Sequence, residues 1–213
     1  MKYKHILIIV FIILLIDQWS KIYVKTNFYY GEEVKVLGDW CKLLFIENEG
    51  MAFGMKILDN EIGKLILTLF RLVAVVFGFF WVKKLSLQGY KKGTMICAAL
   101  ILAGAAGNLI DCLFYGQLFS ATQFPYEVAT WASDGNGYAP FLHGRVVDMF
   151  YFPMIDKILP SWVPIWGGER FTFFDPIFNV ADVAISTGII TLVVFQKKLL
   201  APLTNSQEQE TIA

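Results

Sequence analysis

Residues 178–185, with the sequence FNVADVAI, place an amide and a carboxylate three positions apart at the start of an apolar run. Asn179 supplies the amide and Asp182 the carboxylate. A second acid, Asp148, lies in a similar apolar frame within residues 144–150, GRVVDMF. An acid at the centre of a membrane helix costs at least ~2.5–3.5 kcal/mol, so each one needs a physical reason to be there. We expect Asp148 and Asp182 to meet near one surface of a membrane.

The composition points to the lipid bilayer. The 213 residues are 56% hydrophobic and 16% aromatic, and their formal net charge is zero. A chain without excess positive charge is not built to bind nucleic acid. Four apolar runs predict transmembrane helices at about residues 5–25, 65–82, 94–112 and 177–196.

Two of these runs have informative ends. The first resembles a signal peptide, but no small-residue cleavage site follows it, so we expect a retained helix. The fourth follows Asp175 and Pro176, which are a good helix cap and first helical residue. Asp182 would then lie two turns inside the helix, where capping does not explain it.

Lysines predict the orientation of the chain in the membrane. They occur at the amino terminus (Lys2 and Lys4), four times within residues 83–92, and after the fourth run (Lys197 and Lys198). Cytoplasmic loops carry an excess of Lys and Arg. Both termini are therefore predicted on the cytoplasmic side.

Two segments are left on the outer side, at about residues 26–62 and 113–175. The first alternates apolar and polar residues and predicts two or three short strands. The second is rich in aromatic residues and is either an interfacial decoration or a lid over a site. We expect an all-α membrane protein: a four-transmembrane-helix bundle with a small outer-surface β element and a long outer loop. It would form one domain, 1–213, with a disordered tail at 204–213.

Two helices carry paired polar residues. Asp17 and Lys21 are four apart, so they can form an ion pair. The pair is either only an internal ion pair near the outer end of the helix, or it braces a site or contacts a ligand headgroup. Asn108 and Asp111 end the third run after GAAG at 104–107, whose small residues let another helix approach closely. Asp111 is open to three interpretations: a catalytic acid, an orienter of one, or a polar helix end.

Cysteine and histidine give no sign of a metal site or a disulfide. The spacing of the three cysteines matches neither a metal-binding motif nor a disulfide. We expect Cys41, Cys97 and Cys112 to be unpaired. His5 and His143 are predicted on opposite sides of the membrane and cannot share an ion. We expect no metal and no cofactor.

Five short blocks occur in order along the chain: DQWSK at 17–21, ENEGMAFG at 47–54, GAAGNLID at 104–111, VVD at 146–148 and FNVAD at 178–182. Together they resemble the lipoprotein signal peptidases (signal peptidase II) of bacteria. The resemblance implies an inner-membrane aspartic endopeptidase that removes signal peptides from prolipoproteins. It would cut on the amino side of the diacylglyceryl-modified cysteine, with its active site toward the periplasm.

The resemblance also implies residue roles. The catalytic aspartates match Asp148 and Asp182. Residues that line or support the substrate site match Asp17, Lys21, Asn48, Gly50, Asn108, Asp111 and Asn179. The implied partners are the lipidated prolipoprotein, membrane lipid and cyclic peptide inhibitors such as globomycin.

Two carboxylates held close together in a poorly solvated site cannot both ionise. The charged member can take a proton from an attacking water, and the protonated member can donate to the developing oxyanion.

The sequence departs from the family pattern at two places. The family usually has an arginine after the Asn-x-x-Asp of the third helix, and here that position is Cys112. Arg145 is our candidate to replace it. The family usually joins this motif to Val-Val-Asp by a short turn, whereas here 31 residues, 113–143, intervene.

Two other functions compete with a peptidase. An ion-coupled transporter also carries acids in its membrane helices, but it favours acids spread through the membrane depth and repeated halves. Here the acids gather toward the outer side and no repeat is visible. A non-enzymatic membrane assembly factor would use the acids only to pair helices.

Overall fold

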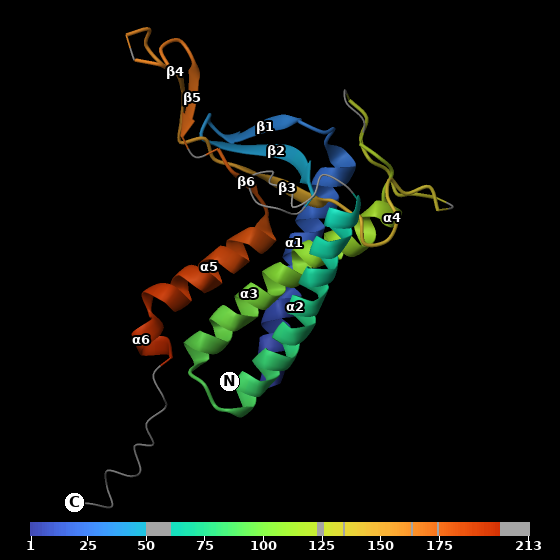
Figure 1. Cartoon of the computed structure of the whole chain (residues 1–213), viewed down its shortest axis with the longest axis vertical. Helices are drawn as coiled ribbons and strands as arrows, with labels where there is room; N and C mark the ends of the chain where they lie inside the picture. Colours follow the sequence, from blue (N-terminus) through green and yellow to red (C-terminus); the bar gives the residue numbers. More distant parts are fainter. Residues whose placement is uncertain (50–60, 123–125, 134, 163, 174, 201–213) are drawn as a thin grey trace, which may run out of the picture. The chain divides into compact units, whose positions relative to one another are not determined.

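The structure is a computed structural model that describes residues 1–49, 61–122, 126–133, 135–162, 164–173 and 175–200 (Figure 1). Gly50 and the predicted disordered tail at 204–213 lie outside these residues. The chain divides into two compact units. Unit 1 comprises Met1–Ile16, Phe70–Gly107 and Val180–Ala213, and unit 2 comprises Asp17–Leu69 and Asn108–Asn179.

Three helices of the described chain are long and apolar enough to cross a membrane. They are α1 (Tyr3–Asn27), α2 (Glu61–Leu87) and α3 (Lys92–Ile110), the last of which continues as helical turns to Leu118. A span needs about 20 residues, because each residue rises about 1.5 Å across roughly 30 Å of hydrocarbon. The first three predicted runs each fall on one of these helices.

The fourth predicted helix starts later than its sequence suggests. Ile177–Phe178 form strand β6, and helix α5 runs only from Val180 to Val194, followed by the short α6 (Gln196–Leu199). The expected cap at Asp175 and Pro176 is therefore wrong, because strand pairing takes the next two residues. The Asp175 carboxylate instead accepts a hydrogen bond from the Tyr151 hydroxyl at 2.9 Å.

This shift changes the position of Asp182. It lies in the first turn of α5 rather than two turns inside a helix. With 15 residues, α5 is about 22 Å long, which is shorter than a full span.

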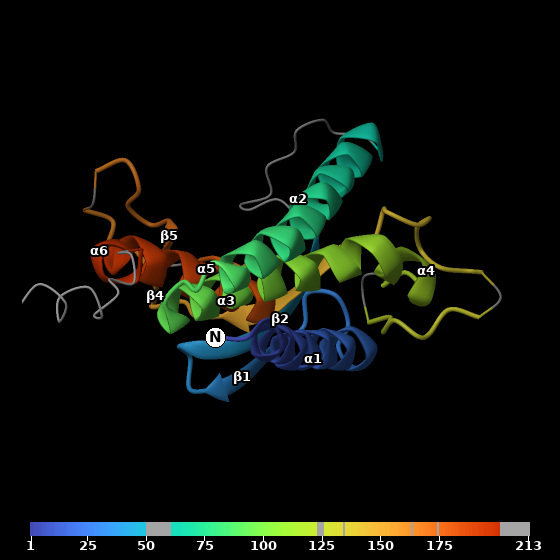
Figure 2. The ribbon, with the colours of Figure 1, turned by 90° about the horizontal axis from the view of Figure 1, so that it is seen from below.

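Glycines bring α3 and α5 together within unit 1, as Figure 2 shows for these two helices. A Cβ atom on Gly104 would lie 2.2 Å from the carbonyl oxygen of Ala181. A Cβ atom on Gly188 would lie 2.8 Å from the carbonyl oxygen of Cys97. The prediction that the small residues at 104–107 admit another helix is confirmed at Gly104.

Unit 2 contains a four-stranded antiparallel sheet with the order β1-β2-β3-β6, whose strands are labelled in Figure 1. Its other strands are β1 (Glu33–Leu37), β2 (Cys41–Asn48) and β3 (Val146–Tyr151). The prediction of strands within 26–62 is confirmed, and the turn between β1 and β2 contains Gly38 with a φ of 56°. Strand β3 lies between β2 and β6, and five of its six residues are buried.

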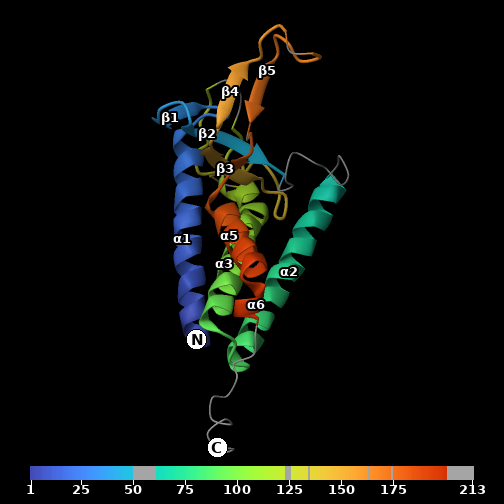
Figure 3. The same ribbon diagram turned by 90° about the vertical axis from the view of Figure 1, so that its left-hand side faces the viewer.

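The prediction of a long loop at 113–175 is wrong. This segment holds β3 and the hairpin of β4 (Ile155–Ile158) and β5 (Arg170–Phe173), which projects from the sheet (Figures 1 and 3). The segment begins within a π-helical turn, Asp111–Tyr115, which is followed by the short α4, Gly116–Leu118. The β-branched and aromatic residues of VVDMFY suit a pleated strand.

The core of unit 2 includes residues from the aromatic-rich segment. Phe119 is fully buried and Ala129 nearly so, and both pack in one cluster with Phe45, Val147 and Met149. Backbone hydrogen bonds hold the segment in place, such as those from Ser120 to Thr130 and from Tyr138 to Phe119. Phe119 and Ala129 are thus part of the core, whereas Tyr126, Trp131 and Trp162 of the same segment are exposed. The choice between an interfacial decoration and a lid stays a prediction.

Candidate functional site

The buried ammonium group of Lys21 organises the polar residues of unit 2. Its Nζ lies 3.0 Å from Asp17 Oδ2, 2.9 Å from Asp111 Oδ2 and 2.8 Å from Asn108 Oδ1. An ammonium has three N–H donors, so these three acceptors match them. The predicted pairing of Asp17 with Lys21 is confirmed, and Asp111 and Asn108 join it from the end of α3.

Asp111 connects this group to strand β3. Its Oδ2 accepts a hydrogen bond from the backbone N–H of Val147 at 3.2 Å, and its Oδ1 accepts one from Gln18 at 2.9 Å. Tyr115 in turn donates its hydroxyl hydrogen to the Gln18 carbonyl oxygen at 3.2 Å. These contacts tie Asp111 to the strand that carries Asp148, and its role as an orienter of a catalytic acid stays a prediction.

Asp148 is 4% exposed and two asparagine amides hold it. Asn179 donates to its Oδ1 at 2.6 Å, and Asn48 donates to its Oδ2. Strand register explains the second contact: Asn48 pairs with Val146, so Asp148 lies two residues further along the same face. The first contact comes from the residue that precedes α5.

Asn179 joins Asp148 to the Lys21 group. Its fully buried amide also lies 3.2 Å from Asn108 Oδ1 and 3.3 Å from the carbonyl oxygen of Val147. Asp17, Lys21, Asn48, Asn108, Asp111, Asp148 and Asn179 therefore form one hydrogen-bonded network within unit 2. This network is an acid–amide site that can hold a carboxylate in a fixed orientation away from bulk water.

A second charged group lies on the other side of β2. Glu47 forms an ion pair with the fully buried Lys25 and lies 3.7 Å from Arg145. The guanidinium of Arg145 also lies 5.5 Å from the centre of the Tyr138 ring. Burial, together with the charge of Glu47, raises the pKa of the Tyr138 phenol, so the ring stays neutral at physiological pH.

The cation beside Cys112 is Lys64 rather than Arg145. Lys64 Nζ lies 3.7 Å from Cys112 Sγ and donates to the carbonyl oxygen of Glu49 at 2.7 Å. Arg145 instead pairs with Glu47, and half of its side chain is exposed. The structure thus differs from our expectation for the replacement of the family arginine.

Three predicted site residues are not among the seven members of this network, and one of them, Arg145, pairs with Glu47 instead. Gly50 lies outside the described residues. Asp182 belongs to unit 1, where it is partly buried in the first turn of α5.

Sequence reasoning missed four polar residues of unit 2: Gln18, Lys25, Glu47 and Lys64. A signal was present for Lys25, which follows Lys21 by four positions and so shares its helix face. Gln18 and Glu47 lie inside the quoted blocks, next to residues that were singled out. Lys64 looked like an ordinary lysine at the end of an apolar run, and only its tertiary contacts distinguish it.

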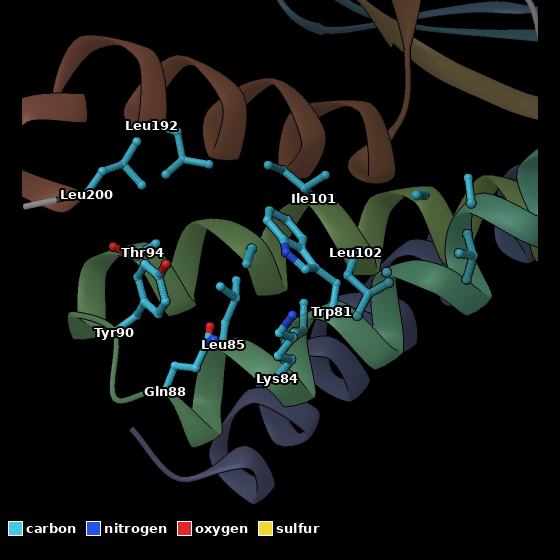
Figure 4. Close-up of a pocket in the computed structure, with 16 residues that line it drawn as sticks. Trp81, Lys84, Leu85, Gln88, Tyr90, Thr94, Ile101, Leu102, Leu192 and Leu200 are labelled. Carbon is cyan, nitrogen blue, oxygen red and sulfur yellow. The ribbon is translucent and has the colours of Figure 1, made fainter. Parts of the chain in front are cut away.

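Unit 1 holds a cavity of about 560 Å³ (Figure 4). It lies between α2, α3 and the carboxyl-terminal part of α5 and α6. Trp81, Lys84, Gln88, Tyr90 and Thr94 line it together with apolar side chains such as Leu102. No carboxylate is among its described lining residues.

Long apolar helices together with a buried network of acids, amides and a lysine define an integral membrane protein with a polar functional site. Comparison with known proteins narrows this class. A model of the family described as signal peptidase (SPase) II matches residues 9–197. The chain belongs to the signal peptidase II family, and it is a bacterial membrane-embedded peptidase.

Individual relatives agree with this membership. The lipoprotein signal peptidase of Porphyromonas gingivalis (strain ATCC 33277) is 42% identical over 207 residues, which cover 96% of this chain and 88% of that protein. The lipoprotein signal peptidase of Amoebophilus asiaticus is 33% identical over 186 residues, covering 86% and 73%. Membership favours a peptidase over a transporter or an assembly factor.

The fold is similar to two solved structures, both described as bacterial membrane enzymes. The first has a TM-score of 0.57 and 21% identity, and the match covers 95% of this chain and 93% of that one. The second has a TM-score of 0.56 and 22% identity, and the match covers 92% and 94%.

Proposed function

We propose that this signal peptidase II is an aspartic endopeptidase in which Asp148 and Asp182 are the two reacting acids. Its substrate is a prolipoprotein whose cysteine carries a diacylglyceryl group, and the cut falls on the amino side of that cysteine. The observation that carries the proposal is Asp148: it is nearly inaccessible to solvent, and Asn48 and Asn179 hold both of its oxygens.

The chain itself limits the distance between the two acids. Asp182 follows Asn179 by three residues, and Asn179 donates to Asp148 at 2.6 Å. Three residues span at most about 11 Å when fully extended, and less once a helix begins. Connectivity therefore keeps Asp182 in the neighbourhood of Asp148, and a shared proton needs the two carboxylates to close the remaining distance.

The surrounding network suits the proposed chemistry. One acid stays charged and takes a proton from a water that attacks the scissile carbonyl, while the other is protonated and donates to the developing oxyanion. Amide donors on Asp148 stabilise its charged form. Either aspartate can hold the shared proton, because coupled acids titrate as a pair.

The membrane position of the site suits a lipidated substrate. We propose four spans with both termini in the cytoplasm, since lysines gather at both termini and within residues 83–92. The fourth span would be the short α5 extended by α6. The sheet and its acids then face the periplasm, where water is available for hydrolysis. Acyl chains on the substrate cysteine can remain in the bilayer, and cyclic peptides such as globomycin would compete for the same site.

The proposal predicts that Asp148→Asn and Asp182→Asn each remove most activity. Asparagine keeps the side-chain shape but cannot exchange the proton, and acid–base groups contribute about 10²–10⁴-fold to rate. Cleavage of a lipidated prolipoprotein by purified protein measures the loss, with the unlipidated precursor as a second substrate. Asp39→Asn is the control, because Asp39 lies in the exposed turn between β1 and β2.

Full cleavage by either of the two variants would reject the pair. Equal cleavage of lipidated and unlipidated precursors would reject the lipid specificity while leaving the chemistry intact.

A further inference from the structure

Lys64 is a buried cation that the mechanism above does not use. Its side chain lies near the start of α2, and the residue is 8% exposed. A buried ammonium loses its hydration, so its position is stable only if partners in the protein replace the lost water. The carbonyl oxygen of Glu49 at 2.7 Å and the sulfur of Cys112 at 3.7 Å are two of these partners.

The two partners belong to the segments on either side of Asp148. Glu49 follows Asn48, whose amide binds the Asp148 carboxylate. Cys112 follows Asp111, whose carboxylate binds the backbone of β3 one residue before Asp148. Lys64 therefore ties the end of β2 to the end of α3, and both elements hold Asp148 in place.

The buried charges near Asp148 give this lysine a second role. Asp17, Asp111 and Asp148 are all buried acids, and Lys21 forms ion pairs with the first two of them. Lys64 brings another buried positive charge beside Cys112, the residue that follows Asp111. A cation in a poorly solvated site lowers the cost of keeping acids charged there.

The sequence supports the same conclusion. In the family pattern described above an arginine follows the Asn-x-x-Asp motif, and here that position is Cys112, whose side chain is short. Arg145 does not supply the positive charge beside Cys112, since it pairs with Glu47. The ammonium of Lys64 meets the Cys112 sulfur from another helix.

We propose that Lys64 is a positioning residue that supplies, from α2, the cation that an arginine at position 112 would otherwise provide. It holds the segment after Asn48 against the end of α3 and so fixes the orientation of Asp148. This inference rests on the proposed function, because it takes Asp148 as a reacting acid.

The test moves the positive charge from position 64 to position 112. Variants Lys64→Met, Lys64→Arg, Cys112→Arg and the double variant Lys64→Met/Cys112→Arg are assayed for kcat and KM on lipidated prolipoprotein, and their melting temperatures are measured. Lys83→Met is the control, since Lys83 is an exposed lysine near the other end of the same helix.

We expect Lys64→Met to lower kcat about 10- to 100-fold, the effect of losing hydrogen bonds to a charged group. Lys64→Arg should keep most activity, and adding Cys112→Arg should restore most of what Lys64→Met lost. If Lys64→Met does not fold, Lys64→Arg and the double variant still carry the test, because both retain a cation.

Wild-type kcat in Lys64→Met would overturn the inference. So would a low kcat in both Lys64→Arg and the double variant, since each of these restores a cation to the site. Asp148→Asn is assayed beside these variants. An inactive Asp148→Asn with a fully active Lys64→Met would reject only the role of Lys64, whereas an active Asp148→Asn would reject the proposed function itself.

Discussion

At the scale of single residues, Lys21 shows how this protein keeps several charges away from water. Each of its three donors has an acceptor within 3.0 Å, and two of those acceptors are carboxylates. Within the described residues, no buried side-chain nitrogen or oxygen lacks a hydrogen-bond partner. A network satisfied in this way is rigid, and its members depend on one another.

Lys21→Met should therefore destabilise the protein strongly. The substitution leaves the buried carboxylates of Asp17 and Asp111 without their cation, and breaking a buried ion pair costs about 3–5 kcal/mol. Thermal unfolding in detergent measures the loss. Adding Asp111→Asn to Lys21→Met removes one of the two stranded charges and should recover part of it; a melting temperature unchanged by Lys21→Met would contradict the network.

At the scale of elements, the approach to β3 depends on a glycine. A Cβ atom on Gly144 would lie 2.0 Å from the backbone oxygen of Asp111, and the N–H of Gly144 donates to the carbonyl of Cys112 at 2.9 Å. Backbone cannot move aside as a flexible side chain can. The close contact therefore fixes where β3 begins relative to the end of α3.

Gly144→Ala should displace the start of β3 and lower both stability and activity. Overpacking a tight site costs about 1–3 kcal/mol, and Asp148 lies only four residues further along the chain. Melting temperature and cleavage rate measure the two effects. Gly78→Ala in α2 is the control, because its new Cβ would meet only the flexible end of Leu102; equal behaviour of both variants would argue against the close contact.

At the scale of the whole molecule, the proposed topology can be tested with the chain's own cysteines. Cys41 begins β2 in the predicted outer segment and is partly exposed, whereas Cys97 and Cys112 are buried. In a variant that keeps only Cys41, a membrane-impermeant maleimide should label intact spheroplasts. Gln88→Cys in a chain without other cysteines is the control, and it should react only after lysis because 83–93 is predicted to be cytoplasmic.

Labelling of Cys41 only after lysis would mean that the chain has the opposite orientation to the one proposed. It would place the sheet on the cytoplasmic side and remove the proposed access to a translocated lipoprotein precursor.

The sequence by itself determined the features that depend on composition and short spacing. The three long helices follow from runs of apolar residues, and the ion pair of Asp17 with Lys21 follows from a separation of four positions. All seven residues of the network were singled out from motifs, since polar residues in apolar surroundings stand out.

Tertiary structure decided what depends on residues far apart in the chain. Asn48 reaches Asp148 across 100 positions and Lys64 reaches Cys112 across 48, and no local pattern encodes either contact. The start of α5 shows the same limit: Asp175 and Pro176 favour a helix locally, but Ile177 and Phe178 pair with β3 instead. Local signals act over about one helical turn, whereas strand pairing and burial depend on which distant segments the folded chain brings together.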